Sequence, residues 1–144
     1  MTLADAVADP VRRHAIALDA VDEAAAAIRS RRGLGASAAQ AGLRAIHRLR
    51  PGFLSDRIEQ LLPAMAEAVD PWWREGLERG DAPMWLHENR NEVANSLLAV
   101  TDAHVAGATD AAAISVYHRL RGSAPGRIAD EMPRIAAFIG RHAT

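Results

Sequence analysis

Apolar residues recur at intervals of three and four along nearly the whole 144-residue chain, and no stretch shows sustained alternation of apolar and polar residues. Intervals of three and four place side chains on one face of an α-helix, whereas alternation places them on one face of a β-strand. We therefore expect an all-α fold. A chain of this length can bury a core of its own, so a single helical domain over residues 1–144 is expected.

Proline, glycine and small polar residues divide this pattern into about six to eight helices. A capping carboxylate stands just before a proline of the first helical turn in three segments: Asp9-Pro10, Asp70-Pro71 and Asp81–Pro83. A helix is expected to start at each of them. Pro63 and Pro133 are expected to kink or interrupt helices, and the polar run 87–92 to contain another break. Two apolar stripes should face the core. The stripe of the first long helix consists of Val11, His14, Leu18, Val21, Ala25 and Ile28. The strongest stripe in the chain consists of Leu54, Ile58, Leu61, Leu62, Met65, Val69 and Trp72.

The tetrapeptide HRLR occurs at residues 47–50 and again at 118–121, and the Arg-Ile and apolar-Pro pairs that follow it recur at nearly the same offset. We interpret this as a weak tandem repeat of two halves, residues 9–72 and 83–142, each with three helices. Neither half could bury its apolar faces alone, so one pseudo-symmetric bundle is expected. The HRLR arginines should lie at helix C-termini, where cations offset the carbonyl dipole. They are secondary candidates for anion binding: Arg48, Arg50, Arg119 and Arg121.

Charge is segregated along the chain although the net charge is −1. Residues 24–55 hold six arginines and no acid, whereas residues 56–110 hold eleven acids and four arginines. Clustered arginines could bind nucleic acid or a phosphorylated ligand. However, the pI is about 6.6, and no aromatic residue lies between Ala24 and Gly52 to stack on bases. We favour pairing of the basic with the acidic segment, within the fold or across a dimer, over nucleic acid as a partner.

No motif assembles a catalytic or metal site. His87-Glu88-Asn89-Arg90-Asn91 lacks the second histidine of a zinc-binding HExxH helix. The glycine-rich stretch 33–38 follows a helix instead of a strand and lacks the Lys-Ser/Thr of a phosphate loop. His14 and His104 lie on apolar seams at similar places in the two halves, and could face each other, but no carboxylate is spaced to orient both. We expect no enzyme, cofactor or metal, and, without a signal peptide or a membrane span, a cytoplasmic protein.

Three of the six aromatic residues, Trp72, Trp73 and Trp85, gather between the proposed halves, with Met84 beside them. Adjacent helical residues point about 100° apart, so Trp72 and Trp73 cannot both face one core. These four residues are the candidate interface or pocket. The leading hypothesis is a non-enzymatic protein that acts by protein-protein interaction or self-association, as a homodimer or with an unknown protein partner. The alternative is a carrier of a small apolar ligand, with a cavity between the halves.

Six segments in this order carry a resemblance: GLGASA, RPGF, LLPAMAEAVDPWW, NEVANSLLAVTDAHVAGA, YHRLRGSA and PRIAAFIGRHA. Together they resemble an uncharacterised family of short helical proteins typical of high-GC actinobacteria, a domain of unknown function. The resemblance covers nearly the whole chain. It implies a stand-alone, cytoplasmic helical domain and brings no activity, cofactor or site residue with it.

Overall fold

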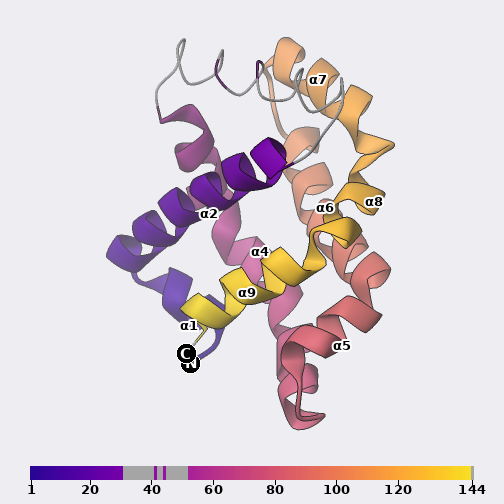
Figure 1. Cartoon of the computed structure of the whole chain (residues 1–144). Helices are drawn as coiled ribbons and strands as arrows, with labels where there is room; N and C mark the ends of the chain where they lie inside the picture. Colours follow the sequence, from indigo (N-terminus) through magenta and orange to yellow (C-terminus); the bar gives the residue numbers. More distant parts are fainter. Residues whose placement is uncertain (31–40, 42–43, 45–51, 144) are drawn as a thin grey trace.

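The computed structural model describes residues 1–30, 41, 44 and 52–143, which form eight α-helices and no strand. The all-α fold class is thus confirmed (Figure 1). Within these residues no helix is both long and apolar enough to cross a membrane. The helices are α1 (Leu3–Ala8), α2 (Pro10–Ser30), α4 (Phe53–Glu78), α5 (Ala82–Glu88), α6 (Arg90–Ala106), α7 (Ala111–Arg121), α8 (Ala124–Asp130) and α9 (Met132–His142).

Helix α4 runs through the middle of the fold and contacts α1, α2, α5 and α6 (Figure 1). The expected helix start at Asp70-Pro71 is wrong, and Pro63 does not restart a helix, because one helix of 26 residues contains both prolines. A proline inside a helix costs about 3 kcal/mol, but each large apolar side chain that is fully buried contributes about 1.5–3 kcal/mol. The apolar stripe of α4 continues past both prolines to Trp73, so burial offsets the two lost hydrogen bonds.

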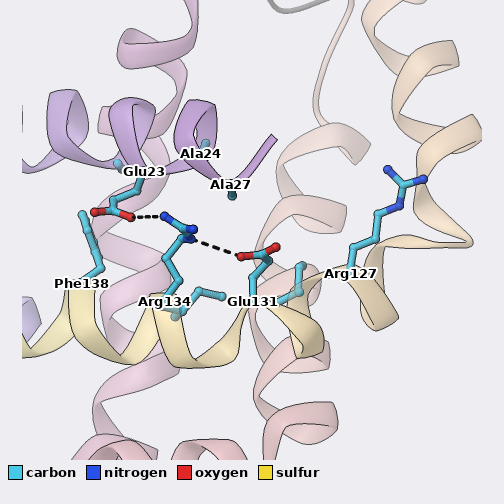
Figure 2. A pocket seen from close by; sticks show the side chains of 10 residues that line it. Glu23, Ala24, Ala27, Arg127, Glu131, Arg134 and Phe138 are labelled. Atoms are coloured by element: carbon cyan, nitrogen blue, oxygen red, sulfur yellow. Dashed lines mark hydrogen bonds and ion pairs between the residues drawn. The ribbon is translucent and has the colours of Figure 1, made fainter. Parts of the chain in front are cut away.

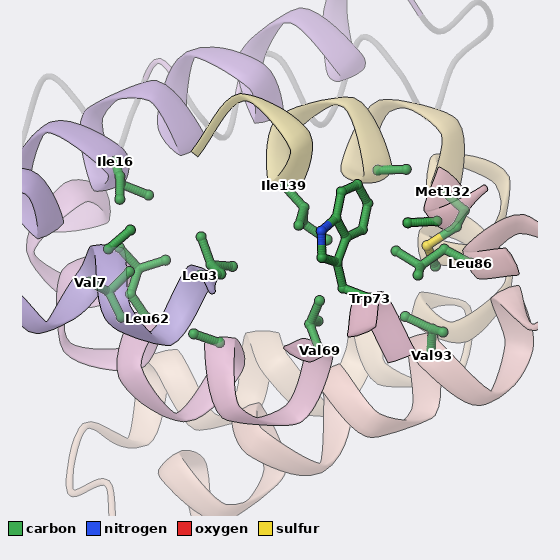
Figure 3. Packing of buried hydrophobic residues seen from close by; sticks show 14 of the residues in the cluster. Leu3, Val7, Ile16, Leu62, Val69, Trp73, Leu86, Val93, Met132 and Ile139 are labelled. Atoms are coloured by element: carbon green, nitrogen blue, oxygen red, sulfur yellow. The ribbon is translucent and has the colours of Figure 1, made fainter. Parts of the chain in front are cut away.

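The core forms where α1, α2, α5, α6 and α9 pack around α4. The indole of Trp73 points from α4 toward α9, beside Ile139 (Figure 3). A Cβ atom placed on Gly140 would lie 3.6 Å from this indole, so α9 approaches the ring closely. The buried residues of this cluster are Leu3, Ala6, Val7, Ile16, Ala17, Leu62, Ala66, Val69, Trp73, Ala82, Leu86, Val93, Met132, Ala136 and Ile139.

Helix α2 buries a different face from the one its apolar stripe predicts. Val11 is 78% exposed and Leu18 is 46% exposed, whereas Ile16 and Ala17 are buried. Alanine occupies every side of this helix, so several faces are nearly equally apolar and the largest side chains do not decide the orientation. Helix α1 packs across α2, and Arg13 donates to the backbone carbonyl of Val7 at 3.2 Å, which turns the Ile16 face inward.

Most other boundaries follow the sequence signals. Asp81 caps α5, the α5–α6 break falls at Asn89, and Pro133 lies in the first turn of α9. Helix α7 begins after its capping residue Asp110 and ends at Arg121, before Gly122. The related halves remain a prediction, since the first HRLR copy lies outside the described residues. Within the described part, Pro63 is inside α4, whereas its counterpart Pro133 lies in the first turn of α9.

Candidate functional site

An apolar groove lies between the C-terminal half of α2 and the helices α8 and α9 (Figure 2). Its volume is about 300 Å³. Alanine, isoleucine and phenylalanine side chains form its walls, and charged side chains stand at its rim. We call it the α2–α9 groove, and its lining residues are Ala20, Glu23, Ala24, Ala27, Arg127, Ile128, Glu131, Arg134, Ile135 and Phe138.

The sequence creates this groove by a difference in side-chain size on the facing helices. Ala20, Ala24 and Ala27 lie four and three positions apart, and therefore on one face of α2. Opposite them, Ile135 and Phe138 lie three apart on α9. Alanine has no side chain beyond Cβ, so the α2 wall leaves open the volume that larger residues would fill. The result is an apolar hollow in place of a packed helix–helix contact.

A chain of ion pairs forms one edge of the groove. Arg134 of α9 contacts Glu23 of α2 at 3.4 Å and Glu131 at 3.3 Å (Figure 2). Glu23 also contacts Arg141 at 2.9 Å, and Arg141 contacts Asp19 at 3.0 Å. These pairs join α2 to α9, so acids from the start of the chain neutralise bases from its end. A second, more polar depression of about 480 Å³ shares Glu23, Glu131 and Arg134 with the groove.

Asp19 occupies the end of this ion-pair chain. Partial burial disfavours its charged form, but hydrogen bonds from His142 and Arg141 more than offset that effect and lower its pKa. His142 Nε2 lies 2.6 Å from the carboxylate, and its ring also packs against Phe138, 4.8 Å between ring centroids. The α9 end of the groove is therefore fixed by both charge and aromatic contact.

A polar cluster between α6 and α7 contains Arg121, one of the sequence-predicted anion candidates. Arg121 binds Asp102 with two hydrogen bonds, of 2.9 and 3.1 Å. The Tyr117 hydroxyl donates to the same carboxylate and lies 2.8 Å from the Thr101 hydroxyl. Hydrogen bonds from Arg121 and then Tyr117 lower the pKa of Asp102. Burial, together with the Asp102 hydrogen bond, raises the pKa of Tyr117.

This cluster holds α7 in place, because α7 has no buried residue. Arg121 is thereby engaged by its own chain, whereas Arg119 is exposed. Arg48 and Arg50 lie outside the described residues, as does the glycine-rich stretch 33–38, so the structure describes only Arg119 and Arg121 of the four anion candidates.

The four candidate interface residues have different surroundings. Trp73 is in the core, Trp72 packs against it half-buried, and Met84 is 51% exposed. Trp85 is half-buried beside Gly76 and lies under the guanidinium of Arg79, 3.9 Å from the ring centroid. Its indole Nε1 is buried with no hydrogen-bond partner among the residues described. Trp85 is thus held largely by its own chain, and Met84 is the most exposed of the four.

The structure does not assemble the two histidine-containing features of the sequence, the His14/His104 pair and the zinc-like motif at residues 87–91, into a site. His14 of α2 is exposed and lies 3.4 Å from Glu59, while His104 is in the last turn of α6, and no hydrogen bond joins the two histidines. His87 lies in the last turn of α5 and Asn91 lies in α6, so a helix break separates the ends of the zinc-like motif. Across residues 1–30, 41, 44 and 52–143, no group of three His, Asp or Glu side chains could hold a metal ion.

The α2–α9 groove was not predicted from the sequence. One signal was available: alanines at 20, 24 and 27 on one helix face, with Ile128, Ile135 and Phe138 elsewhere at helical spacing. That signal does not indicate which helices face each other, so it could not locate the groove.

No curated protein matches the chain, and no solved structure matches it either. A family model, described as a family of unknown function (DUF6918), matches residues 3–143. The match spans all the described helices, and with it the chain belongs to the DUF6918 family.

Proposed function

We propose that this protein binds a small apolar ligand in the α2–α9 groove. The observation that carries the proposal is a hollow of about 300 Å³ with apolar walls and an ion-paired edge. Ligand sites are concave, mostly apolar and equipped with a few polar groups at fixed places. The groove also lies between α2, from the first proposed half, and α8–α9, from the second. It therefore supports the carrier hypothesis with a cavity between the halves.

The polar groups of the groove favour binding over catalysis. Its carboxylates belong to Glu23 and Glu131, and Arg134 pairs with both. A general base or nucleophile needs a carboxylate free to approach the substrate and a group to orient it. Carboxylates held in ion pairs at the rim suit a structural role, while the apolar walls supply the binding surface.

A neutral fluorescent probe, N-phenyl-1-naphthylamine, tests the proposal, because its emission rises in an apolar site. We expect the wild-type chain to bind it and Ala24→Leu to bind it at least tenfold more weakly, since leucine would occupy the groove. Ala15→Leu is the matched control: residues 15 and 24 lie about half a helical turn apart in direction, so Ala15 faces away. Equal binding by all three proteins would contradict the proposal, as would no binding by the wild type.

Self-association is a second candidate, favoured by the apolar side chains at the α4–α5 turn. Leu77 is 60% exposed and Met84 is 51% exposed, close in sequence to the half-buried Trp85. Exposed apolar patches mark interaction surfaces. Sedimentation equilibrium should then show a dimer that Met84→Glu weakens and Val116→Glu, on α7, does not. A wild-type monomer at high concentration would exclude this candidate and leave the ligand proposal intact.

A further inference from the structure

One arginine at the rim of the α2–α9 groove lies outside the ion pairs formed by the described residues. Arg134 is shared by Glu23 and Glu131, and Arg141 is shared by Glu23 and Asp19. Each of these three acids therefore contacts at least one of the two arginines. Arg127, which also lines the groove, has no ion pair within the part of the chain that the structure describes.

Arg127 lies apart from the ion-pair chain. Figure 2 shows the pairs running from Glu23 through Arg134 to Glu131, with Arg127 on the far side of Glu131. Its side chain comes from the last turn of α8 and is exposed. Between Arg127 and Phe138 the lining consists mainly of alanine and isoleucine. A molecule in the groove would thus have an apolar body and meet an unpaired guanidinium near one end.

We propose that the ligand is a single-chain amphiphile with an anionic head group, a carboxylate, bound at Arg127, its apolar chain lying along the groove. This inference rests on the ligand-binding function proposed above. A guanidinium presents paired N–H donors that match a carboxylate. The groove volume corresponds to roughly ten water-sized volumes of ~30 Å³, which is sufficient for a chain of roughly eight to ten carbons.

A cationic head group fits the charges less well. Glu23 and Glu131 already pair with Arg134. Asp130 lines only the neighbouring polar depression and not the groove. A cation in the groove would meet Arg127 without a free carboxylate to offset it. The unpaired guanidinium of Arg127 therefore favours an anionic head group over a cationic one.

Three probes with the same ten-carbon chain separate the head group from the chain: decanoate, decan-1-ol and decyltrimethylammonium, titrated by calorimetry below micelle formation. We expect the binding of all three probes to depend on the alkyl chain. Decanoate should bind roughly two- to fivefold more tightly than decan-1-ol, as for one exposed ion pair. Arg127→Gln should reduce decanoate binding to the level of decan-1-ol and leave decan-1-ol unchanged. Arg119→Gln, an exposed arginine of α7, should leave both unchanged.

The outcomes distinguish this inference from the function on which it rests. Decan-1-ol binding as tightly as decanoate, a preference for the cation, or no effect of Arg127→Gln would overturn the anionic head group alone. If no probe binds, both the anionic head group and the ligand-binding function are overturned. A dimer that Ala24→Leu dissociates would then identify a second copy of the chain as the occupant of the groove. Binding to phosphatidylglycerol vesicles without binding to monomeric decanoate would overturn the single-molecule ligand in favour of a membrane surface.

Discussion

Asp70 accepts a hydrogen bond of 3.1 Å from the backbone amide of Leu3, although 67 positions separate the two residues. Its other carboxylate oxygen accepts from the amide of Ala4 at 2.9 Å. Asp70 is the one charged side chain buried within the described residues. A carboxylate in the middle of α4 thus satisfies the first backbone donors of α1 and fixes the start of the chain against the core.

Asp70→Asn should destabilise the protein by about 1–3 kcal/mol. Asparagine keeps one acceptor oxygen but turns an NH₂ group toward a backbone donor, which leaves buried donors unsatisfied. Urea unfolding measures the loss, and hydrogen exchange should show faster exchange of the α1 amides.

Asp81→Asn is the control for this change. Asp81 caps α5 locally, by accepting from Met84 at 3.0 Å on the exposed surface. Asparagine caps a helix about as well as aspartate does, so this variant should stay close to the wild-type stability. Equal losses in the two variants would show that the long-range cap has no special role.

Asp70 also shows what the sequence could and could not predict. The pair Asp70-Pro71 has the pattern of a helix start, and the carboxylate does cap a helix, but the helix is α1 and not its own. Local signals at Asp9-Pro10 and Asp81 were sufficient to predict helix starts, because the backbone amides that these carboxylates bind lie within one turn. Where the partner is distant in sequence, the same residue types give no indication of it.

The buried face of α2 and the groove were missed for a related reason. Apolar periodicity identifies a face only when one face is clearly more apolar than the others, and alanine surrounds α2. The packing of α1 and α9 determines which alanines of α2 contact α4 and which leave a hollow beside α9. The all-α class needed no such information, because period alone predicts it.

Gly76→Ala should destabilise the α4–α5 contact. A Cβ atom at this position would lie 2.6 Å from the Cα of Ala82, closer than packed atoms can approach. Overpacking of this kind costs about 1–3 kcal/mol. Thermal unfolding should show the loss.

Gly126→Ala is the matched control for Gly76→Ala, since nothing lies within 4 Å of the added atom in α8. Because alanine is the better helix former, this variant should be stabilised by about 0.5–1 kcal/mol. If Gly76→Ala were as stable as Gly126→Ala, α4 and α5 would not pack as closely as described.

The Asp102 cluster should make stability depend on pH in the acid range. Hydrogen bonds from Arg121 and Tyr117 lower the pKa of Asp102 below its ordinary value of 3.8, so the unfolded chain takes up the proton first. The stabilisation is therefore present above pH 3.8 and is lost as the pH falls through the lowered pKa. Asp102→Asn should be less stable than the wild type at pH 7, and the difference should shrink toward pH 2.

Tyr117→Phe is a milder change in the same cluster. It removes one hydroxyl shared with Thr101 and Asp102, and should cost about 0.5–1.5 kcal/mol while keeping the Arg121–Asp102 pair. Unfolding of Asp102→Asn and Tyr117→Phe from pH 7 to 2 measures both effects. A pH-independent difference between Asp102→Asn and the wild type would contradict the role given to the carboxylate.

The central claim is that the α2–α9 groove binds an apolar chain, and methyl NMR during titration with decan-1-ol tests it most directly. We predict saturable shifts of the methyl signals of Ala20, Ala24, Ala27, Ile128 and Ile135, which line the groove. The methyl groups of Ala15 and Val11, on the exposed outer face of α2, should not move. Shifts spread over both faces of α2, or confined to residues outside the groove, would contradict the claim.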